Sequence, residues 1–153
     1  MKHSIIPLFI PHLGCPHQCI FCNQVRITGR STSVEADEIK KTIDSYIESG
    51  SSDKFWEAAF YGGSFTALPV PVIESLLMPA FKALKQGKIH AIRLSTRPDC
   101  INEDILQLLS TYGVTTVELG VQSLDNNILL TAERGHTAED VVHAVSLLKK
   151  HHF

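Results

Sequence analysis

Residues 55–64 of the chain read FWEAAFYGGS, an apolar, aromatic-rich run that ends in two glycines and a serine. A short apolar run of this kind, bounded by turn residues, is typical of a buried strand in a parallel sheet, here over Phe55–Tyr61. A helical pattern follows: Pro69 and Pro71 open it and Gly87 ends it. The stretch therefore predicts a strand, a glycine turn and a helix in succession.

The same unit recurs along the chain. Further strands are predicted at Ile5–Ile10, Ile89–Ser95 and Val114–Val121. Helices are predicted to start after three N-cap residues, Ser33, Asn102 and Thr137, with Gly50 ending the first of them and a short extra helix at Asp125–Leu130. Thr137 and Asp140 resemble a capping box with aspartate in the glutamate position. Four strand–helix units in sequence predict an α/β fold with a parallel sheet, either open or part of a barrel.

Polar segments follow all four predicted strands. They are the cysteine-rich segment after the first strand, Gly62–Ser64 after the second, Ser95–Arg97 after the third and Gln122 after the fourth. The carboxyl ends of parallel strands meet at one edge of a sheet, where α/β folds place their chemistry. We expect these segments to share one rim.

Composition restricts the class of protein. With 153 residues, of which 44% are hydrophobic, the chain can bury one core. A formal net charge of −2 argues against strong non-specific binding to nucleic acid, although a local basic groove stays open. No run approaches the roughly 18 apolar residues that cross a bilayer, and Pro7 interrupts the short apolar segment near the N-terminus. We expect a cytoplasmic protein without a membrane partner.

Three of the four cysteines form the motif Cys15-x3-Cys19-x2-Cys22, while Cys100 stands far away. Such a cluster favours a metal site over disulfides. Three thiolates on one loop suit a 4Fe–4S cluster, and the iron without a protein ligand is then open to a cosubstrate. The alternative is a zinc site with His12 or His17 as fourth ligand.

Five stretches together carry a family resemblance: FIPHLGCP (9–16), FCNQ (21–24), FYGGSFT (60–66), STRPD (95–99) and ELGVQSLD (118–125). They resemble the radical S-adenosylmethionine (SAM) superfamily. The similarity is greatest to bacterial relatives of the elongator complex catalytic subunit, a tRNA-modifying protein. Oxygen-independent coproporphyrinogen III oxidase is a more distant likeness.

The resemblance implies a radical SAM enzyme. SAM would chelate the open iron, and one electron from the 4Fe–4S cluster would cleave it to methionine and a 5′-deoxyadenosyl radical that abstracts hydrogen. It further implies an electron donor such as ferredoxin or flavodoxin, and tRNA as substrate. The family's barrel has six units and this sequence supplies about four, so residues 1–153 would form the N-terminal part of a single radical SAM domain.

The resemblance also assigns site residues. Cys15, Cys19 and Cys22 would bind the cluster, and Phe21 would lie against the adenine. The backbone at Gly62 and Gly63 would receive the methionine amino group, since glycine permits close approach.

Four further side chains are assigned to SAM. Gln122 matches a SAM-contacting glutamine, and Arg134 matches an arginine that pairs with the methionine carboxylate. Ser64 stands where many members have an acid, and Ser95 stands where the coproporphyrinogen enzyme has a SAM-binding glutamate.

Several alternatives stay open. Glu118 is either a ligand or a solvent-facing strand residue, and Arg97 either holds its loop or contacts SAM. His12 and His17 are interpreted as loop-packing residues, and Cys100 as a small buried apolar residue. Tetrapyrrole chemistry of the coproporphyrinogen type is the second enzymatic hypothesis. A non-catalytic cluster- or zinc-binding module is the competing class.

Overall fold

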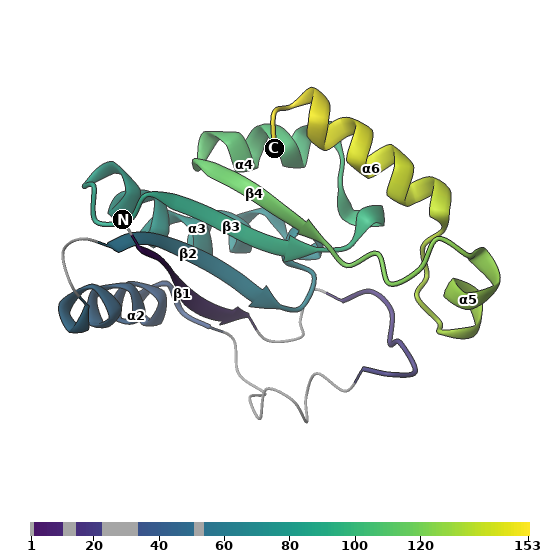
Figure 1. The fold of residues 1–153 in the computed structure, drawn as a ribbon, viewed down its shortest axis with the longest axis horizontal. Coiled ribbons are helices and arrows are strands. Elements are labelled where there is room, and N and C mark those ends of the chain that lie inside the picture. The colour runs from purple at the N-terminus through teal and green to yellow at the C-terminus, as the bar shows by residue number, and fades with distance from the viewer. Residues whose placement is uncertain (1, 11–14, 23–33, 51–53) are drawn as a thin grey trace.

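A four-stranded parallel sheet lies at the centre of the protein, as shown in the computed structural model (Figure 1). The structure describes residues 2–10, 15–22, 34–50 and 54–153. The strands are β1 (Lys2–Ile10), β2 (Lys54–Gly62), β3 (Ala91–Thr96) and β4 (Val114–Leu119), in the order β1-β2-β3-β4. All three neighbouring pairs are parallel, as predicted. The carboxyl ends of the strands are level, because Ile10 pairs with Gly62 and Thr96 pairs with Leu119.

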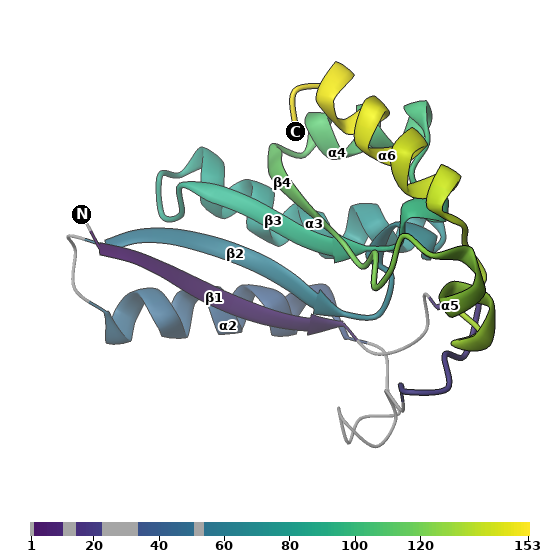
Figure 2. The ribbon, with the colours of Figure 1, turned by 45° about the vertical axis from the view of Figure 1, so that its right-hand side comes forward.

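Helices connect the strands. They are α2 (Ala36–Ser49), α3 (Val70–Lys85), α4 (Glu103–Thr111), α5 (Asn126–Thr131) and α6 (Ala138–Lys150), with 3-10 turns η2 (Phe65–Ala67) and η3 (Pro98–Cys100). Helices α2 and α3 lie side by side on one face of the sheet (Figures 1 and 2). A sheet whose strands follow chain order, with right-handed crossovers, places its helices on one side, as in a barrel. A doubly wound sheet reverses its order and carries helices on both sides. Of the two predicted architectures, an open doubly wound sheet and part of a barrel, the partial barrel is therefore confirmed.

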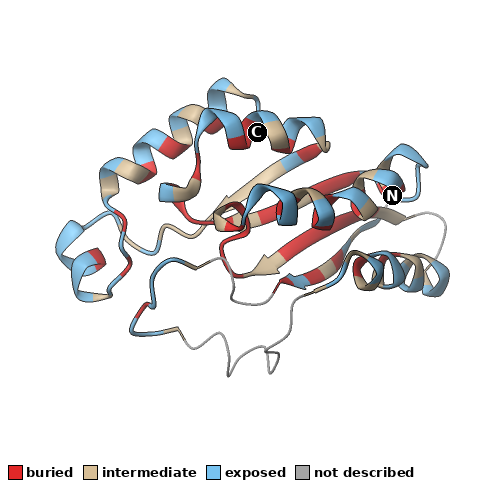
Figure 3. Cartoon of the chain, turned by 180° about the vertical axis from the view of Figure 1, so that it is seen from behind, coloured by how far each residue is buried: buried red, intermediate tan, exposed pale blue. Residues whose placement is uncertain are grey.

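The hydrophobic core lies between this face and the helices (Figure 3). Alternate strand residues point into it, as the period of a strand requires. The strand members include Ile6, Leu8, Ala58, Phe60, Ile92 and Leu94, and the helical members include Ile39, Ile43, Ile73, Leu77, Leu106 and Leu109. On the opposite face the edge strand β1 leaves Ile5 and Phe9 exposed. Apolar residues of the helices thus form the side of the core that faces the sheet.

Two predicted helix caps are confirmed. Asn102 Oδ1 accepts a hydrogen bond of 2.9 Å from the Ile105 N–H at the start of α4. Thr137 and Asp140 form a reciprocal capping box at the start of α6. Each cap satisfies N–H groups that the first helical turn leaves without partners.

The predicted cap at Ser33 is wrong. Helix α2 begins at Ala36 and its N-cap position is Glu35, while Ser33 lies outside the described residues. Glu35 makes no side-chain capping hydrogen bond. A serine signal close to the helix start therefore misplaced the boundary by two residues, a common error for helix ends.

Strand boundaries also differ from the predictions. Strand β1 starts at Lys2 because its ladder with β2 continues to Lys54. Strand β3 starts at Ala91, where pairing with Glu57 begins. Strand β4 ends at Leu119. None of the helices within residues 34–50 and 54–153 is long and apolar enough to cross a membrane.

Candidate functional site

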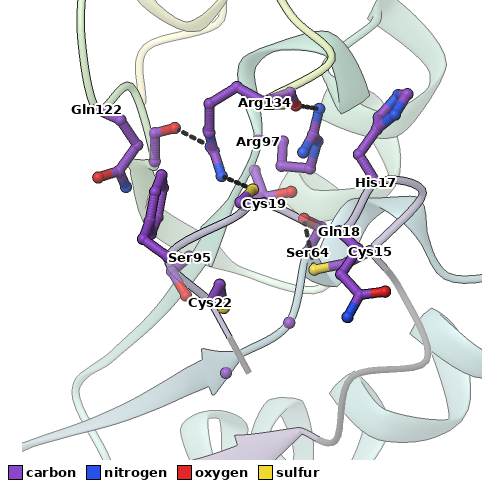
Figure 4. Close-up of a pocket in the computed structure, with 15 residues that line it drawn as sticks. Cys15, His17, Gln18, Cys19, Cys22, Ser64, Ser95, Arg97, Gln122 and Arg134 are labelled. Atoms are coloured by element: carbon purple, nitrogen blue, oxygen red, sulfur yellow. Dashed lines mark hydrogen bonds between the residues drawn. The ribbon is translucent and has the colours of Figure 1, made fainter. Parts of the chain in front are cut away.

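One pocket lies at the carboxyl ends of the strands (Figure 4). It is lined by residues at or just after the carboxyl end of every strand and by the turn before α6: Cys15, His17, Gln18, Cys19, Phe21, Cys22, Gly62, Gly63, Ser64, Ser95, Thr96, Arg97, Gly120, Gln122 and Arg134. All ten residues that the sequence singled out for the metal and the cosubstrate are among them. The shared rim expected from the parallel sheet is therefore present.

The cysteine loop forms one wall of this pocket. Cys19 is buried, Cys15 and Cys22 are half-buried, and all three thiols are free. A backbone hydrogen bond of 3.0 Å from the Cys22 N–H to the Cys19 carbonyl turns the chain between them. Phe21 is 56% exposed, so its ring is available to a ligand in the pocket.

Two polar side chains contact the cysteine sulfurs. The Ser64 hydroxyl lies 3.5 Å from Sγ of Cys15. Arg134 Nη1 donates a hydrogen bond of 3.2 Å to Sγ of Cys19, while its Nη2 donates to the carbonyl of Gly120 (Figure 4). Arg134 is only 8% exposed, so its positive charge lies largely out of water beside the thiols. Ser64 and Arg134, both assigned to SAM from the resemblance, thus touch the cysteines directly.

The glycine turn after β2 is required by packing. Gly62 has φ +114°, and a Cβ there would lie 2.3 Å from the carbonyl oxygen of Ile10. The Gly63 N–H donates to the same oxygen over 3.3 Å. A side chain at position 62 would push β1 and β2 apart, so the fold itself demands the first glycine.

The end of β3 holds a buried hydrogen-bond cluster. Thr66 Oγ1 lies 2.6 Å from Thr96 Oγ1 and donates to the Cys100 carbonyl over 2.7 Å. Ser95 is half-buried and its hydroxyl donates to the Phe60 carbonyl over 3.4 Å. These bonds join the loops after β2 and β3 behind the pocket.

The sequence leaves open whether Arg97 holds its loop or contacts SAM. In the structure its side chain bonds to Asp99 and to the main chain of Arg134. Its Nε donates to Oδ1 of Asp99 and its Nη2 donates to Oδ2, each over 3.0 Å. Nη2 also donates to the Arg134 carbonyl. Burial would lower the pKa of Arg97, but the hydrogen bonds and charge of Asp99 outweigh burial and raise that pKa. The guanidinium therefore stays charged and fixed between two loops.

The end of β4 carries backbone strain. Gln122 has φ +67°, in the left-handed region that glycine favours. A non-glycine residue there costs roughly 1–3 kcal/mol, and such strain clusters at functional sites. Gln122 lines the pocket, so the strained backbone aims a polar side chain at it.

Glu118 takes part in an ion-pair network away from the pocket. Arg93 lies between Glu118 at 2.5 Å and Glu57 at 3.0 Å. The hydrogen bonds to Glu57 and then Glu118 raise the pKa of Arg93. Of the two hypotheses for Glu118, its placement favours a structural strand residue.

The remaining cysteine and histidines have distinct surroundings. Burial, followed by the charge of Asp99, raises the pKa of the half-buried Cys100 thiol. His17 lines the pocket, and its ring packs against Gly135, while His12 lies outside the described residues. Among the residues that the structure describes, no group of three His, Cys, Asp or Glu side chains converges on a single ion position.

The sequence patterns did not predict a role for His136. It is buried, its Nε2 lies 3.2 Å from the Val121 carbonyl, and its Nδ1 has no hydrogen-bond partner among the described residues. Burial, followed by the positive charge of Arg134, lowers its pKa. Its position two residues after Arg134 is the one signal that could have drawn attention to it.

Comparison with known proteins identifies the family. Residues 9–153 match the Radical SAM superfamily. The chain is similar to a tRNA uridine(34) acetyltransferase of Methanocaldococcus infernus, with 50% identity over 186 aligned residues that cover 95% of this chain and 34% of the relative. This chain spans less than half the length of the first curated relatives.

Solved structures show the same fold. Coproporphyrinogen III oxidase (HemN) from Escherichia coli, a radical SAM enzyme, superimposes with a TM-score of 0.66 at 17% identity, over 97% of this chain and 34% of that one. The methyltransferase TsrM from Kitasatospora setae, with cobalamin and a [4Fe-4S] cluster bound, gives 0.65 at 16% identity, over 98% and 29%. The match along residues 9–153, together with the shared fold, shows that this chain belongs to the radical SAM superfamily of enzymes.

Proposed function

We propose that this chain binds a 4Fe–4S cluster through Cys15, Cys19 and Cys22, binds SAM beside it and cleaves SAM reductively. The observation that carries the proposal is the pocket that joins the cysteine loop to the ends of β2, β3 and β4. Membership of the superfamily supports the same chemistry.

The chemistry of the donor set fits a cluster better than a single zinc ion. A structural zinc site needs its ligands at about 2.0–2.3 Å from one point. Structural zinc sites usually pair their cysteines, and this sequence has no second cysteine pair downstream of Cys22, since Cys100 stands alone. A cubane cluster binds each cysteine through a different iron, so its thiols are spread around it. The three free thiols on one loop, two of them in contact with Ser64 and Arg134, suit that arrangement.

The remaining pocket residues are suited to hold SAM. Gly62 and Gly63 line the pocket, where their backbone can receive the methionine amino group, and Phe21 presents an exposed ring for the adenine. Ser95 and Gln122 offer hydrogen-bonding groups on the far rim.

Arg134 is suited to the methionine carboxylate. Its guanidinium lines the pocket, and a guanidinium pairs well with a carboxylate. When bound, the cluster and SAM supply one-electron cleavage of the sulfonium and hydrogen-atom abstraction from a substrate. The protein's part is to orient the two groups and to exclude water around Cys19 and Arg134.

For the substrate we propose tRNA. The support is the similarity to the tRNA uridine(34) acetyltransferase of M. infernus, at 50% identity. The E. coli coproporphyrinogen oxidase shares the fold at 17% identity, which supports the architecture and not its substrate.

The proposed function is tested by anaerobic reconstitution with iron and sulfide, reduction with dithionite or flavodoxin, and an assay for 5′-deoxyadenosine. We expect 5′-deoxyadenosine to form with SAM and to increase when tRNA is added, but not when coproporphyrinogen is added. A cluster-loaded chain that cleaves no SAM would contradict the cleavage. Cleavage that responds to coproporphyrinogen and not to tRNA would contradict the substrate.

A further inference from the structure

Two buried arginines meet behind the cysteine loop. Arg97 is 3% exposed and Arg134 is 8% exposed. Nη2 of Arg97 donates a hydrogen bond to the main-chain carbonyl of Arg134 (Figure 4). The contact joins the loop after β3 to the turn between α5 and α6, which are 37 positions apart in the sequence.

The charges of the two arginines are balanced differently. Arg97 forms a two-pronged ion pair with Asp99, in which Nε and Nη2 each lie 3.0 Å from a carboxylate oxygen. This geometry fixes the plane of the guanidinium. Arg134 has no such carboxylate among the described residues: its Nη1 donates to Sγ of Cys19 and its Nη2 to the Gly120 carbonyl. The positive charge of Arg134 therefore lies largely out of water and against the sulfur of Cys19.

The turn that carries Arg134 also seats the cysteine loop through two other contacts. The Ile20 N–H donates to the Ala132 carbonyl over 3.3 Å. The His17 ring packs so closely on Gly135 that a Cβ there would lie 2.3 Å from it. Movement of this turn would therefore move the whole cysteine loop.

We propose that Arg97 is a positioning residue: anchored by Asp99, it holds the Arg134 carbonyl, keeps the Arg134 guanidinium on Cys19 Sγ and thereby raises the reduction potential of the cluster. The inference rests on the proposed function for the cluster itself. A hydrogen bond and a positive charge at a ligating sulfur stabilise the reduced cluster, which carries one more negative charge. Loss of the anchor should make the cluster harder to reduce.

The variant Arg97→Gln tests the anchor, and Arg93→Gln is its matched control. Both residues come from β3 or its end and both pair with carboxylates, but Arg93 contacts Glu57 and Glu118 and does not line the pocket. Asp99→Asn is the second variant, because it removes the charge that anchors Arg97 while keeping a side chain of nearly the same shape. Arg97→Lys keeps one donor without the two-pronged geometry and should give an intermediate result.

The first readout uses the metal-free chain and hydrogen–deuterium exchange of the Ile20 amide. We expect Arg97→Gln and Asp99→Asn to speed this exchange about tenfold relative to amides of β2, and Arg93→Gln to leave the ratio unchanged. If the exchange rate of the Ile20 amide relative to the β2 amides is unchanged in both Arg97→Gln and Asp99→Asn, Arg97 does not anchor the turn. Because the exchange measurement needs no cluster, it tests whether Arg97 anchors the turn even if the proposed function is wrong.

The second readout is the midpoint potential of the reconstituted cluster, followed by electron paramagnetic resonance during a reductive titration. We expect Arg97→Gln to lower the equilibrium constant for one-electron reduction of the cluster about tenfold, which lowers the midpoint potential by about 59 mV. Arg93→Gln should have the midpoint potential of the wild type. Faster Ile20 exchange with an unchanged potential would overturn the link to the cluster. A wild-type chain that takes up no cluster would instead contradict the proposed function.

Discussion

Nη1 of Arg134 lies 3.2 Å from Sγ of Cys19, although the two residues are 115 positions apart in the chain. The cysteine loop follows β1, and Arg134 lies in the turn between α5 and α6. The site is therefore assembled from both ends of the chain, and its geometry depends on the packing of the sheet between them. Substitutions in the turn between α5 and α6 should therefore change the geometry of the cysteine loop.

Gly135→Ala should destabilise the protein and weaken iron retention. Gly135 has φ +72°, which costs an alanine about 1–2 kcal/mol, and the added Cβ would also lie 2.3 Å from the His17 ring. Overpacking of this kind adds about 1–3 kcal/mol. The free energy of unfolding in urea and the iron content after reconstitution measure the two effects.

Gly87→Ala is the control for the backbone strain, since Gly87 has φ +70° but a Cβ added there would meet nothing within 4 Å. It should lose only the conformational part, with normal iron content. Equal losses of stability in the two variants would show that the His17 contact is absent in solution.

Thr66→Val should cost about 1–3 kcal/mol of unfolding free energy. The substitution leaves the buried Thr96 hydroxyl without its 2.6 Å partner and the Cys100 carbonyl without its 2.7 Å donor. Thr111→Val removes a similar bond on the exposed surface of α4 and should change stability by less than about 0.5 kcal/mol. Chemical denaturation compares them, and a Thr66→Val protein as stable as the Thr111→Val protein would rule out a tightly bonded Thr66 cluster.

Gln122→Gly should stabilise the fold and weaken SAM binding at the same time. Glycine relieves the strain at φ +67°, a gain of about 1 kcal/mol, but removes a side chain that lines the pocket. Urea denaturation and equilibrium dialysis with SAM on the cluster-loaded protein measure the two changes. Unchanged SAM affinity would remove Gln122 from the proposed SAM contacts.

Acidification should destabilise the protein through His136. Burial and the Arg134 charge hold the pKa of His136 below its usual value of about 6.5, so below that pH the unfolded chain binds a proton that the folded chain excludes. Stability should therefore rise with pH up to about 6.5 and then level off. His136→Gln should flatten this dependence, measured by urea denaturation of the metal-free chain at several pH values. A slope that persists in His136→Gln would assign it to other groups.

Much of the site could be predicted because parallel strands bring their carboxyl ends to one edge of a sheet. The strand pattern alone placed the cysteine loop, Gly62, Ser95 and Gln122 on a common rim, and the pocket contains them all. Helix caps made by a side-chain hydrogen bond, such as the one at Asn102, could be predicted equally well. In these cases the signal is local in sequence or follows from the topology.

Contacts between distant loops could not be predicted in this way. No spacing rule links Arg97 to the carbonyl of Arg134, because the contact depends on how the turn before α6 packs against the loop after β3. The surroundings of His136 have the same origin. The start of α2 was misplaced because Glu35, which occupies its N-cap position, makes no side-chain cap that a sequence pattern would reveal.

In the proposed function Cys15, Cys19 and Cys22 together hold one iron–sulfur cluster, and the direct test is iron and sulfide analysis of the anaerobically reconstituted protein. We expect close to four irons per chain. The content should be near zero in Cys19→Ala and unchanged in the matched Cys100→Ala, whose thiol lies outside the pocket. A colourless wild-type protein that holds one zinc ion, or iron loading that survives Cys19→Ala, would contradict it.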